Sequence, residues 1–370
     1  MRPTICLNMI VKNEAPTIRK CLESVRPLID TWVIVDTGST DGTQDVIRDC
    51  FADLPGALHE RPWKGFDGSR TEAIELARSS ADYLLFIDGD DEMQIQSGFR
   101  MPELTLDAYQ VALHDGPIVH WRPALVSTRL PWRYVGVLHE YIDCGAEYGR
   151  DVIEGFNILS VGGGARFREE GQRAKYLRDA EVLTEGLAKE PDNSRYAFYL
   201  AQSWRDAGEP EKALAAYDHR VAMGGWAEET YCAQLYAARL AVTLERPPAE
   251  VTDRYLRAHE SRPSRAEALG DLARLCRLES RWPLAYLFAR QAVRVPHPED
   301  ILFVEFAWHD WRALDELAVA AYWTGEYEES LDCCQLLLQG GKLPADQQDR
   351  VLANLEFARR KLGVGSPAFA

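Results

Sequence analysis

The feature that most restricts the fold of this chain is the hydrophobic pattern of its first 165 residues. Short apolar runs rich in β-branched residues, at 5–11, 32–36 and 83–88, alternate with stretches whose apolar residues recur at helical spacing, as at 69–80. This alternation predicts strands separated by helices. Such an order is typical of a Rossmann-like α/β domain with a parallel sheet.

The pattern changes after residue 165. Gly162-Gly163-Gly164 predicts a flexible break, and from Gln172 onward the apolar residues keep a helical spacing without strand-like runs. We therefore expect two domains, an α/β domain over 1–165 and an all-α domain over 166–370.

Residues of the second half repeat a two-helix pattern. Tyr199-Leu200-Ala201 followed by Ala207-Gly208-Glu209 resembles the tetratricopeptide plan, in which small residues let antiparallel helices pack closely, and similar groups recur near Trp282 and Tyr327. The spacings exceed the usual period of about 34 residues, so the predicted repeats are degenerate. Two roles are open for the resulting solenoid: binding of a peptide or protein partner, and packing or formation of a homodimer.

Composition restricts the kinds of partner that the chain can bind. The 370 residues include 58 Asp and Glu against 42 Lys and Arg, a formal net charge of −16, which disfavours nucleic acid and suits a bound cation. Apolar runs fall short of the roughly 20 residues that cross a bilayer, so we expect no transmembrane segment. Eight cysteines without a C-x-x-C pair indicate buried, reduced thiols in a cytoplasmic protein.

An acidic run after the third apolar segment is the strongest chemical signal. Asp88, Asp90 and Asp91 follow the apolar residues 83–87. Carboxylates crowded at the end of a buried strand repel one another, and a divalent cation that also binds substrate phosphates would remove that cost. The alternative is an acidic turn exposed to water.

A second acidic residue ends the second apolar segment. Asp36 precedes a turn of small residues, 37–43, that leads into a helical pattern, which is where open α/β sheets bind nucleotides. We expect Asp36 to accept hydrogen bonds from a base or ribose, and Asp41 to be a turn or cap residue. The chain lacks G-x-G-x-x-G and G-x-x-x-x-G-K-[ST], so dinucleotide and P-loop sites are disfavoured.

Four motifs together resemble family 2 glycosyltransferases of the GT-A fold. They are Met9-Ile10-Val11-Lys12-Asn13-Glu14, then 35–43, then Trp63, Phe66 and Arg70, and then 86–91. The resemblance covers about residues 1–165. The helical second half is similar to an extension in one bacterial branch, which includes peptide S-glycosyltransferases of the sublancin type.

The resemblance implies a site for a nucleotide-sugar donor, usually a UDP-sugar. The ends of the first two strands hold the nucleotide in this family, which implicates Ile10, Val11, Glu14 and Asp36. Arg70 matches a basic position near the donor diphosphate. Asp88 and Asp90 match the DxD pair: the family uses the second mainly for Mn²⁺ or Mg²⁺, and the first faces the ribose or a metal-bound water.

A last element, 134–140, resembles the G-x-x-H-E sequence late in the same catalytic domain. His139 is a candidate third metal ligand, and Glu140 is a candidate general base for the acceptor hydroxyl or thiol. Neighbours on an extended strand face opposite ways, so Glu140 alternatively points away from the site. Asp91 is the competing base.

Other side chains near these motifs have two interpretations each. Trp63 and Phe66 either line the acceptor cleft or, as we favour, belong to the core. Arg122, Arg129 and Arg133 either receive an anionic group or lie on a solvated loop.

The expected activity is metal-dependent transfer of a sugar from a nucleotide-sugar to an acceptor, which the resemblance suggests is a peptide or protein side chain; it also implies inversion at the anomeric carbon. Two alternatives remain: a helical-repeat scaffold with a non-catalytic first half, and a nucleotidyltransferase, which also places carboxylates and metal at a strand end.

Overall fold

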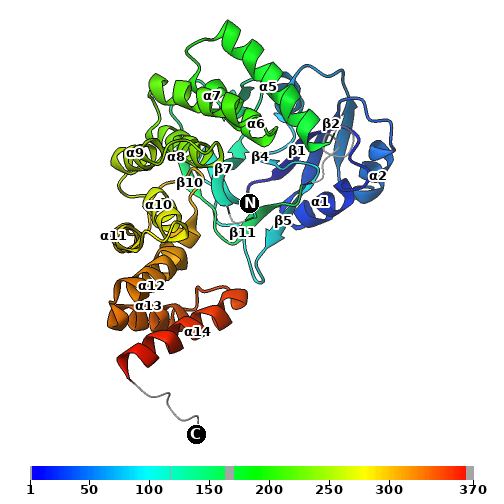
Figure 1. Ribbon diagram of the computed structural model, residues 1–370. Coiled ribbons are helices and arrows are strands. Elements are labelled where there is room, and N and C mark those ends of the chain that lie inside the picture. Colours follow the sequence, from blue (N-terminus) through cyan, green and yellow to red (C-terminus); the bar gives the residue numbers. More distant parts are fainter. Residues whose placement is uncertain (1, 117, 163–170, 364–370) are drawn as a thin grey trace. The chain divides into compact units, whose positions relative to one another are not determined.

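The computed structural model describes residues 2–116, 118–162 and 171–363 (Figure 1). Contacts divide the chain into two compact units, Met1–Glu209 and Pro210–Ala370. The expected boundary at residue 165 lies outside the described residues and stays a prediction. Strands give way to helices on either side of it, since the last strand ends at Ser160 and the next described helix begins at Gln172.

The first unit contains a mixed sheet and its covering helices. Its strands are β1 (Ile5–Val11), β2 (Thr31–Asp36), β3 (Gly56–Glu60), β4 (Tyr83–Phe86), β5 (Asp91–Ile95), β6 (Ala108–Asp115), β7 (Ile118–Ser127), β8 (Arg133–Val135), β9 (Tyr141–Asp143), β10 (Arg150–Val152) and β11 (Phe156–Ser160). Its helices are α1 (Ile18–Val25), the short η1 (Arg26–Leu28), α2 (Thr43–Cys50), α3 (Phe66–Ala77), α5 (Gln172–Lys189) and α6 (Ser194–Asp206).

The sheet has the order β3-β2-β1-β4-β7-β6-β11-β5, with β10 beside β6. The first four strands are parallel, as predicted, but β7 runs antiparallel to both β4 and β6, and β5 runs antiparallel to β11. The expectation of a wholly parallel sheet is therefore wrong. The reason is local: only two residues separate β6 from β7 in the sequence, which is too few for the crossover helix that a parallel pair needs.

The core of this unit forms as the periodicity predicts. Ile18, Cys21, Leu22 and Val25 recur at helical spacing and are all buried on the inner face of α1. β1 is buried along almost its whole length because helices cover a doubly wound sheet on both faces. The carboxyl ends of β1, β2 and β4 therefore lie at one edge of a rigid layer.

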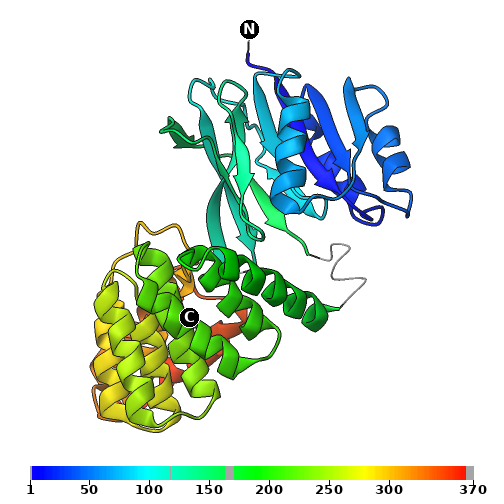
Figure 2. The same ribbon diagram turned by 90° about the horizontal axis from the view of Figure 1, so that it is seen from above.

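The regular elements of the second unit, within its described residues 210–363, are helices. Its elements are α7 (Pro210–Met223), α8 (Ala227–Thr243), α9 (Pro248–Ser261), α10 (Glu267–Leu278), α11 (Trp282–Val293), η2 (Trp308–Arg312), α12 (Ala313–Thr324), α13 (Tyr327–Gln339) and α14 (Ala345–Leu362). Helices adjacent in sequence pack side by side, as Figure 2 shows, and many buried contact positions are alanine. An α/β domain followed by helical repeats is thus confirmed.

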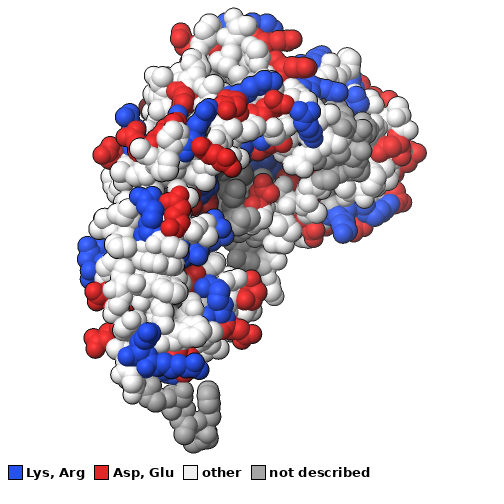
Figure 3. Space-filling view, viewed as in Figure 1, with Lys and Arg blue, Asp and Glu red and all other residues white. Residues whose placement is uncertain are grey.

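Surface and thiol chemistry agree with the composition. Lys and Arg side chains are interspersed with Asp and Glu side chains on the face drawn in Figure 3. All eight cysteines are free thiols, and seven of them are buried. Among the helices of the described residues, none combines the length and apolar character needed to span a bilayer.

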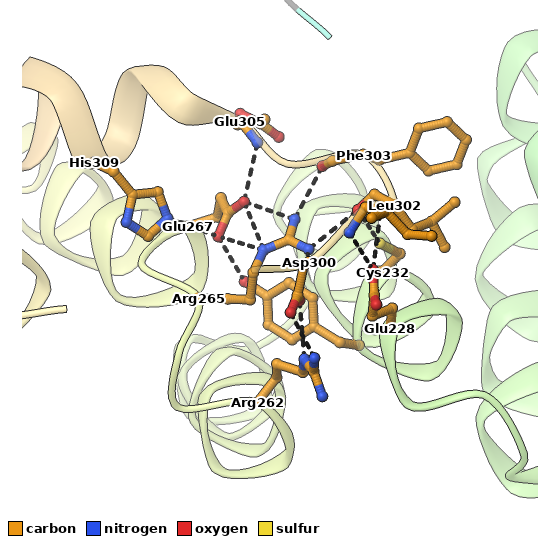
Figure 4. Close-up of polar contacts among 12 residues, drawn as sticks. Glu228, Cys232, Arg262, Arg265, Glu267, Asp300, Leu302, Phe303, Glu305 and His309 are labelled. Atoms are coloured by element: carbon orange, nitrogen blue, oxygen red, sulfur yellow. Dashed lines mark hydrogen bonds and ion pairs between the residues drawn. The ribbon is translucent and has the colours of Figure 1, made fainter. Parts of the chain in front are cut away.

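A buried ion network organises the second unit (Figure 4). Arg265 is fully buried and donates to Glu267 at 2.7 Å, to Asp300 at 3.2 Å and to the carbonyls of Leu302 and Phe303 at 3.1 and 2.9 Å. All of its charge-bearing nitrogens are thus engaged, which a buried guanidinium requires. The network fixes the irregular segment between α11 and η2 against α10.

Candidate active site

Two loops at the sheet edge are joined by side-chain hydrogen bonds. After β1, the backbone N–H of Asn13 donates to Ser39 Oγ at 2.8 Å, and the N–H of Glu14 donates to Thr43 Oγ1 at 2.9 Å. In return, Asn13 Oδ1 accepts from the N–H of Thr40 at 2.9 Å. Small hydroxyl and amide side chains in 37–43 therefore serve to hold the two strand ends together, which explains their density in that turn.

Asp41 is a turn residue, as expected. Its carboxylate accepts from the N–H groups of Ala15 and Thr43, both at 3.0 Å. Burial opposes ionisation, but these bonds and the one from the Thr43 hydroxyl lower the pKa of Asp41 below its usual value.

Asp36 ends β2 and is only 1% exposed. Its Oδ1 accepts from the backbone N–H groups of Gly38 and Ser39, both at 2.8 Å. Its Oδ2 is buried and accepts no hydrogen bond within the described part of the chain. A buried acceptor without a donor costs free energy, so this oxygen is suited to a donor that arrives with a ligand.

The other nucleotide candidates lie at the same edge. Val11 is buried, and its carbonyl accepts from the N–H and hydroxyl of Thr37. Glu14 approaches the loop after β4 closely, because a Cβ built on Gly89 would lie 3.4 Å from Glu14 Cγ and 3.8 Å from Val11 Cγ1. Ile10 is half-buried on β1. The ends of β1 and β4 are therefore in contact, and Gly89 permits this approach.

Arg70, on α3, lies between two of the candidate carboxylates. Its Nη2 is 2.5 Å from Asp88 Oδ1 and its Nε is 2.6 Å from Glu140 Oε1, and its guanidinium packs on the Tyr134 ring at 5.4 Å. Burial alone would lower the pKa of Arg70, but the charges of Asp88 and Glu140 raise it well above its usual value. Glu140 therefore points into the cluster, contrary to the alternative in which it faces away.

Asp88 has a second cationic partner that sequence reasoning had left between two interpretations. Arg122 Nη1, on β7, lies 3.4 Å from Asp88 Oδ2. Burial opposes ionisation of Asp88, but Arg70 and Arg122 hold its pKa far below the usual range. By contrast, Arg129 and Arg133 pair with Asp107 and Asp143 at exposed positions.

Asp91 is the first residue of β5 rather than part of a loop, and it is 6% exposed. The predicted strand 83–88 correspondingly ends earlier, at Phe86. Burial, with the neighbouring charge of Asp88, raises the pKa of Asp91 to about 7, although Arg122 Nη2 lies 3.6 Å away.

The donor set of the predicted metal site can be tested against this geometry. Within 2–116, 118–162 and 171–363, no group of three or more His, Cys, Asp and Glu side chains is placed to hold a metal ion. Both oxygens of Asp88 already face guanidinium groups. The residues thus fit a hard cation that takes one or two carboxylates and completes its shell with substrate phosphates, and not an all-protein cage. The ligand roles of Asp88, Asp90 and His139 remain predictions.

His139 lies on the loop between β8 and β9 and is exposed. Its ring stacks on Tyr199 of α6, with centroids 3.9 Å apart and an interplanar angle of 9°. Its carbonyl accepts two hydrogen bonds from Arg195. Sequence reasoning missed Arg195 and Tyr199 because residues more than 50 positions away in a helical pattern carry no local signal of this contact.

The core interpretation of Trp63 is wrong, since this side chain is 46% exposed. Its ring packs edge-on against the ring of the half-buried Phe66, with centroids 4.8 Å apart. Trp63 precedes α3, and Phe66 is the first residue of this helix. The pair lies on the surface because the segment that precedes α3 is a loop.

Comparisons with known proteins agree with this geometry. Residues 6–98 match the model of Glycosyl transferase family 2. The SPbeta prophage-derived glycosyltransferase SunS of Bacillus subtilis is 26% identical over 225 residues, which cover 57% of this chain and 52% of SunS. The lipopolysaccharide core biosynthesis glycosyltransferase LpsC of Rhizobium meliloti is 33% identical over 117 residues, 31% of this chain and 40% of LpsC. The chain therefore spans about half the length of the curated relatives it matches.

A solved tetratricopeptide repeat protein from Parabacteroides merdae covers 54% of this chain and 70% of its own length at 18% identity. The TM-score is 0.37, which is too low to establish a shared arrangement.

Proposed function

From the match of residues 6–98 to glycosyl transferase family 2, we propose that this chain transfers a sugar from a nucleotide-sugar donor, a UDP-sugar, to an acceptor. The observation that carries the proposal is the gathering of Asp36, Asp88, Arg70 and Glu140 where β1, β2 and β4 end. Ligands of open α/β sheets bind outside the carboxyl ends of the strands.

Asp36 recognises the base. Among the described residues, none donates to its buried Oδ2, while Oδ1 is held in place by two backbone N–H groups. The N3–H of uracil supplies the donor that this oxygen lacks, so a uridine nucleotide fits better than a cytidine nucleotide, which has no N–H at that ring position. Ile10, Val11 and Glu14 line the same edge.

The diphosphate binds beside Asp88 and Asp90, with His139 as a further candidate metal ligand. When bound, Mn²⁺ or Mg²⁺ neutralises charge on the departing diphosphate. Arg70 and Arg122 are the chain's own cations at this point, both within 3.4 Å of Asp88. A guanidinium pairs with phosphate oxygens in the same two-point geometry as with carboxylates. Both arginines can therefore exchange their contacts with Asp88 for contacts with the phosphates of the donor.

Glu140 takes the proton of the acceptor. In the free chain, its Oε1 is 2.6 Å from Arg70 Nε, so this guanidinium occupies the carboxylate. Transfer of Arg70 to the donor diphosphate releases this carboxylate, so that base activation follows donor binding. Asp91 is the alternative base. Attack opposite the leaving group inverts the anomeric carbon, as the family resemblance implies.

The acceptor in this proposal is a peptide or protein side chain. The helical second unit supports it, because stacked helix pairs offer extended surfaces for polypeptide partners. Formation of a homodimer through the same helices is the competing use. A cytoplasmic location is part of the proposal because all eight cysteines are free thiols.

The decisive experiment incubates the full chain with a panel of sugar nucleotides and Mn²⁺ and identifies the products. Release of a nucleoside diphosphate supports the proposal, and Asp90→Ala should abolish both this release and Mn²⁺-dependent binding of UDP. Formation of pyrophosphate would instead identify a nucleotidyltransferase. Calorimetric failure to bind any nucleoside diphosphate with Mn²⁺ would favour the scaffold alternative.

A further inference from the structure

Helix α6 contacts the short loop that carries His139 and Glu140. Arg195 donates to the carbonyl of His139 from Nε at 3.0 Å and from Nη2 at 2.7 Å. One residue further along α6, the hydroxyl of Tyr196 accepts from the N–H of Val137 at 3.2 Å. One turn after Arg195, Tyr199 adds a third contact, since its ring stacks on the imidazole of His139 with centroids 3.9 Å apart.

We infer that Arg195 and Tyr199 are positioning residues of the sugar-transfer reaction, which they assist by fixing the backbone and ring of His139 and, through that backbone, the carboxylate of Glu140. This inference rests on the proposed function. It makes the first helices after the sheet a working part of the active site.

The loop needs external support because its own backbone is unfavourable. His139 has φ +50° and Gly136 has φ +121°, so two residues within four positions lie in the left-handed region. A non-glycine residue there is strained, and this conformation persists only when surrounding contacts stabilise it. The flanking strands β8 and β9 are three residues each and pair only with each other.

Arg195 supplies that support with a rigid fork. Both of its hydrogen bonds converge on one carbonyl, and its guanidinium lies over the rings of Tyr199 and Tyr141 at 4.9 and 5.4 Å. Tyr141 follows Glu140 directly and begins β9. Arg195 thus holds the chain on both sides of Glu140, whose carboxylate extends to Arg70 on the other side.

The helix pair is itself fitted to the loop. Asn193 caps α6 by accepting from the N–H of Tyr196 at 3.1 Å. On α5, a Cβ on Gly186 would lie 3.1 Å from the Tyr196 ring and 3.2 Å from Val137 Cγ2. Glycine is unfavourable inside a helix relative to alanine, and here it lets α5 approach both α6 and the loop that carries His139 and Glu140.

Kinetics of four variants of the full chain test the inference. Arg195→Gln and Tyr199→Ala should lower kcat about 10- to 100-fold, with a much smaller change in the KM for the donor, because misplacement of a reacting group impairs the chemical step. Tyr199→Phe keeps the stacked ring and should retain wild-type kcat. The matched control is Arg173→Gln: Arg173 also donates to a backbone carbonyl, that of Ala207, at 3.1 Å, but lies outside the loop contacts. Arg173→Gln should leave kcat unchanged.

An independent measurement follows the loop itself. Amide hydrogen exchange at residues 137–140 should accelerate in Arg195→Gln and Tyr199→Ala and stay at the wild-type rate in Tyr199→Phe and Arg173→Gln. Unchanged exchange in Arg195→Gln overturns the inference, even for a chain that is inactive on every donor. Faster exchange with unchanged kcat in an active chain overturns it too. If the variants show this exchange pattern but wild type turns over no sugar nucleotide, the proposed function fails, and the inference about catalysis fails with it.

Discussion

Arg70 occupies the position between Asp88 and Glu140, with its Nη2 2.5 Å from one carboxylate and its Nε 2.6 Å from the other. Asp88 and Glu140, which are 52 positions apart in the sequence, thus share one cation. The Glu140 side chain is 10% exposed and that of Asp88 is 33% exposed, and Asp88 has Arg122 as a second cation, so Glu140 depends on Arg70 more than Asp88 does.

Arg70→Met should destabilise the first unit by about 2–4 kcal/mol, because it removes the cation beside the buried Glu140 carboxylate and one of the two cations beside Asp88. Urea unfolding followed by tryptophan fluorescence measures this change. The control is Arg129→Met, which removes an arginine 58% exposed and paired with Asp107, and should cost less than about 1 kcal/mol. Equal costs for the two variants would show that the Arg70 pairs contribute no more than a surface ion pair.

Asp36→Asn should weaken UDP binding by about 10- to 100-fold, because an amide nitrogen in place of one oxygen opposes the N3–H of uracil. Isothermal calorimetry in the presence of Mn²⁺ measures the Kd. Asp45→Asn, on the exposed face of α2, is the matched control and should bind UDP like wild type. Unaltered binding by Asp36→Asn would remove Asp36 from the base site.

Asp91 gives the metal-free chain a pH-dependent stability. Its pKa rises from 3.8 to about 7 on folding, so between these values the folded chain retains a proton that the unfolded chain has lost. The contribution of Asp91 is therefore most favourable below about pH 4 and is lost as pH rises towards 7. In EDTA at pH 8, Asp91→Asn should be more stable than wild type, by on the order of 2 kcal/mol, and the difference should shrink at pH 4. A difference independent of pH would contradict the raised pKa.

In the second unit, Arg265→Met should cost about 3–5 kcal/mol, since Glu267 and Asp300 lose a fully buried partner. The control is Arg257→Met, whose arginine is 70% exposed and pairs with Asp253 on the same helix, and which should cost less than about 0.5 kcal/mol. Chemical denaturation, in which unfolding of the second unit is followed separately, measures the loss of stability in both variants. A small effect of Arg265→Met would show that the segment between α11 and η2 does not depend on Arg265 for its stability.

The sequence predicts best what depends on local periodicity. β1 begins and ends at the expected residues 5 and 11, and the four expected apolar positions of α1 are buried. β3, by contrast, was missed because its Gly-Ala-Leu-His-Glu sequence has few β-branched residues and is half exposed. β8 to β10 were missed because strands of three residues carry too little periodicity.

Ion pairs between residues from different elements could not be predicted from the sequence. The motifs indicated that Asp88, Arg70 and Glu140 share a site, but the pairing of Arg70 with both carboxylates depends on where α3 and the β8–β9 loop meet. Arg265 follows the same logic, since an arginine in a helical sequence is ordinarily exposed and only the fold buries it. The pairs of Arg70 with Glu140 and of Arg265 with Asp300 involve residues far apart in the chain, so local patterns do not encode them.

The account centres on a donor site whose base catalyst is released from Arg70. The most direct test compares wild type with Glu140→Gln for UDP binding by calorimetry and for UDP release from the preferred UDP-sugar with Mn²⁺ and acceptor present. We predict the same Kd for UDP and a rate of release at least about 100-fold lower in the variant, as expected for loss of a general base. Equal rates of release would contradict the assignment of Glu140 and the mechanism built on it.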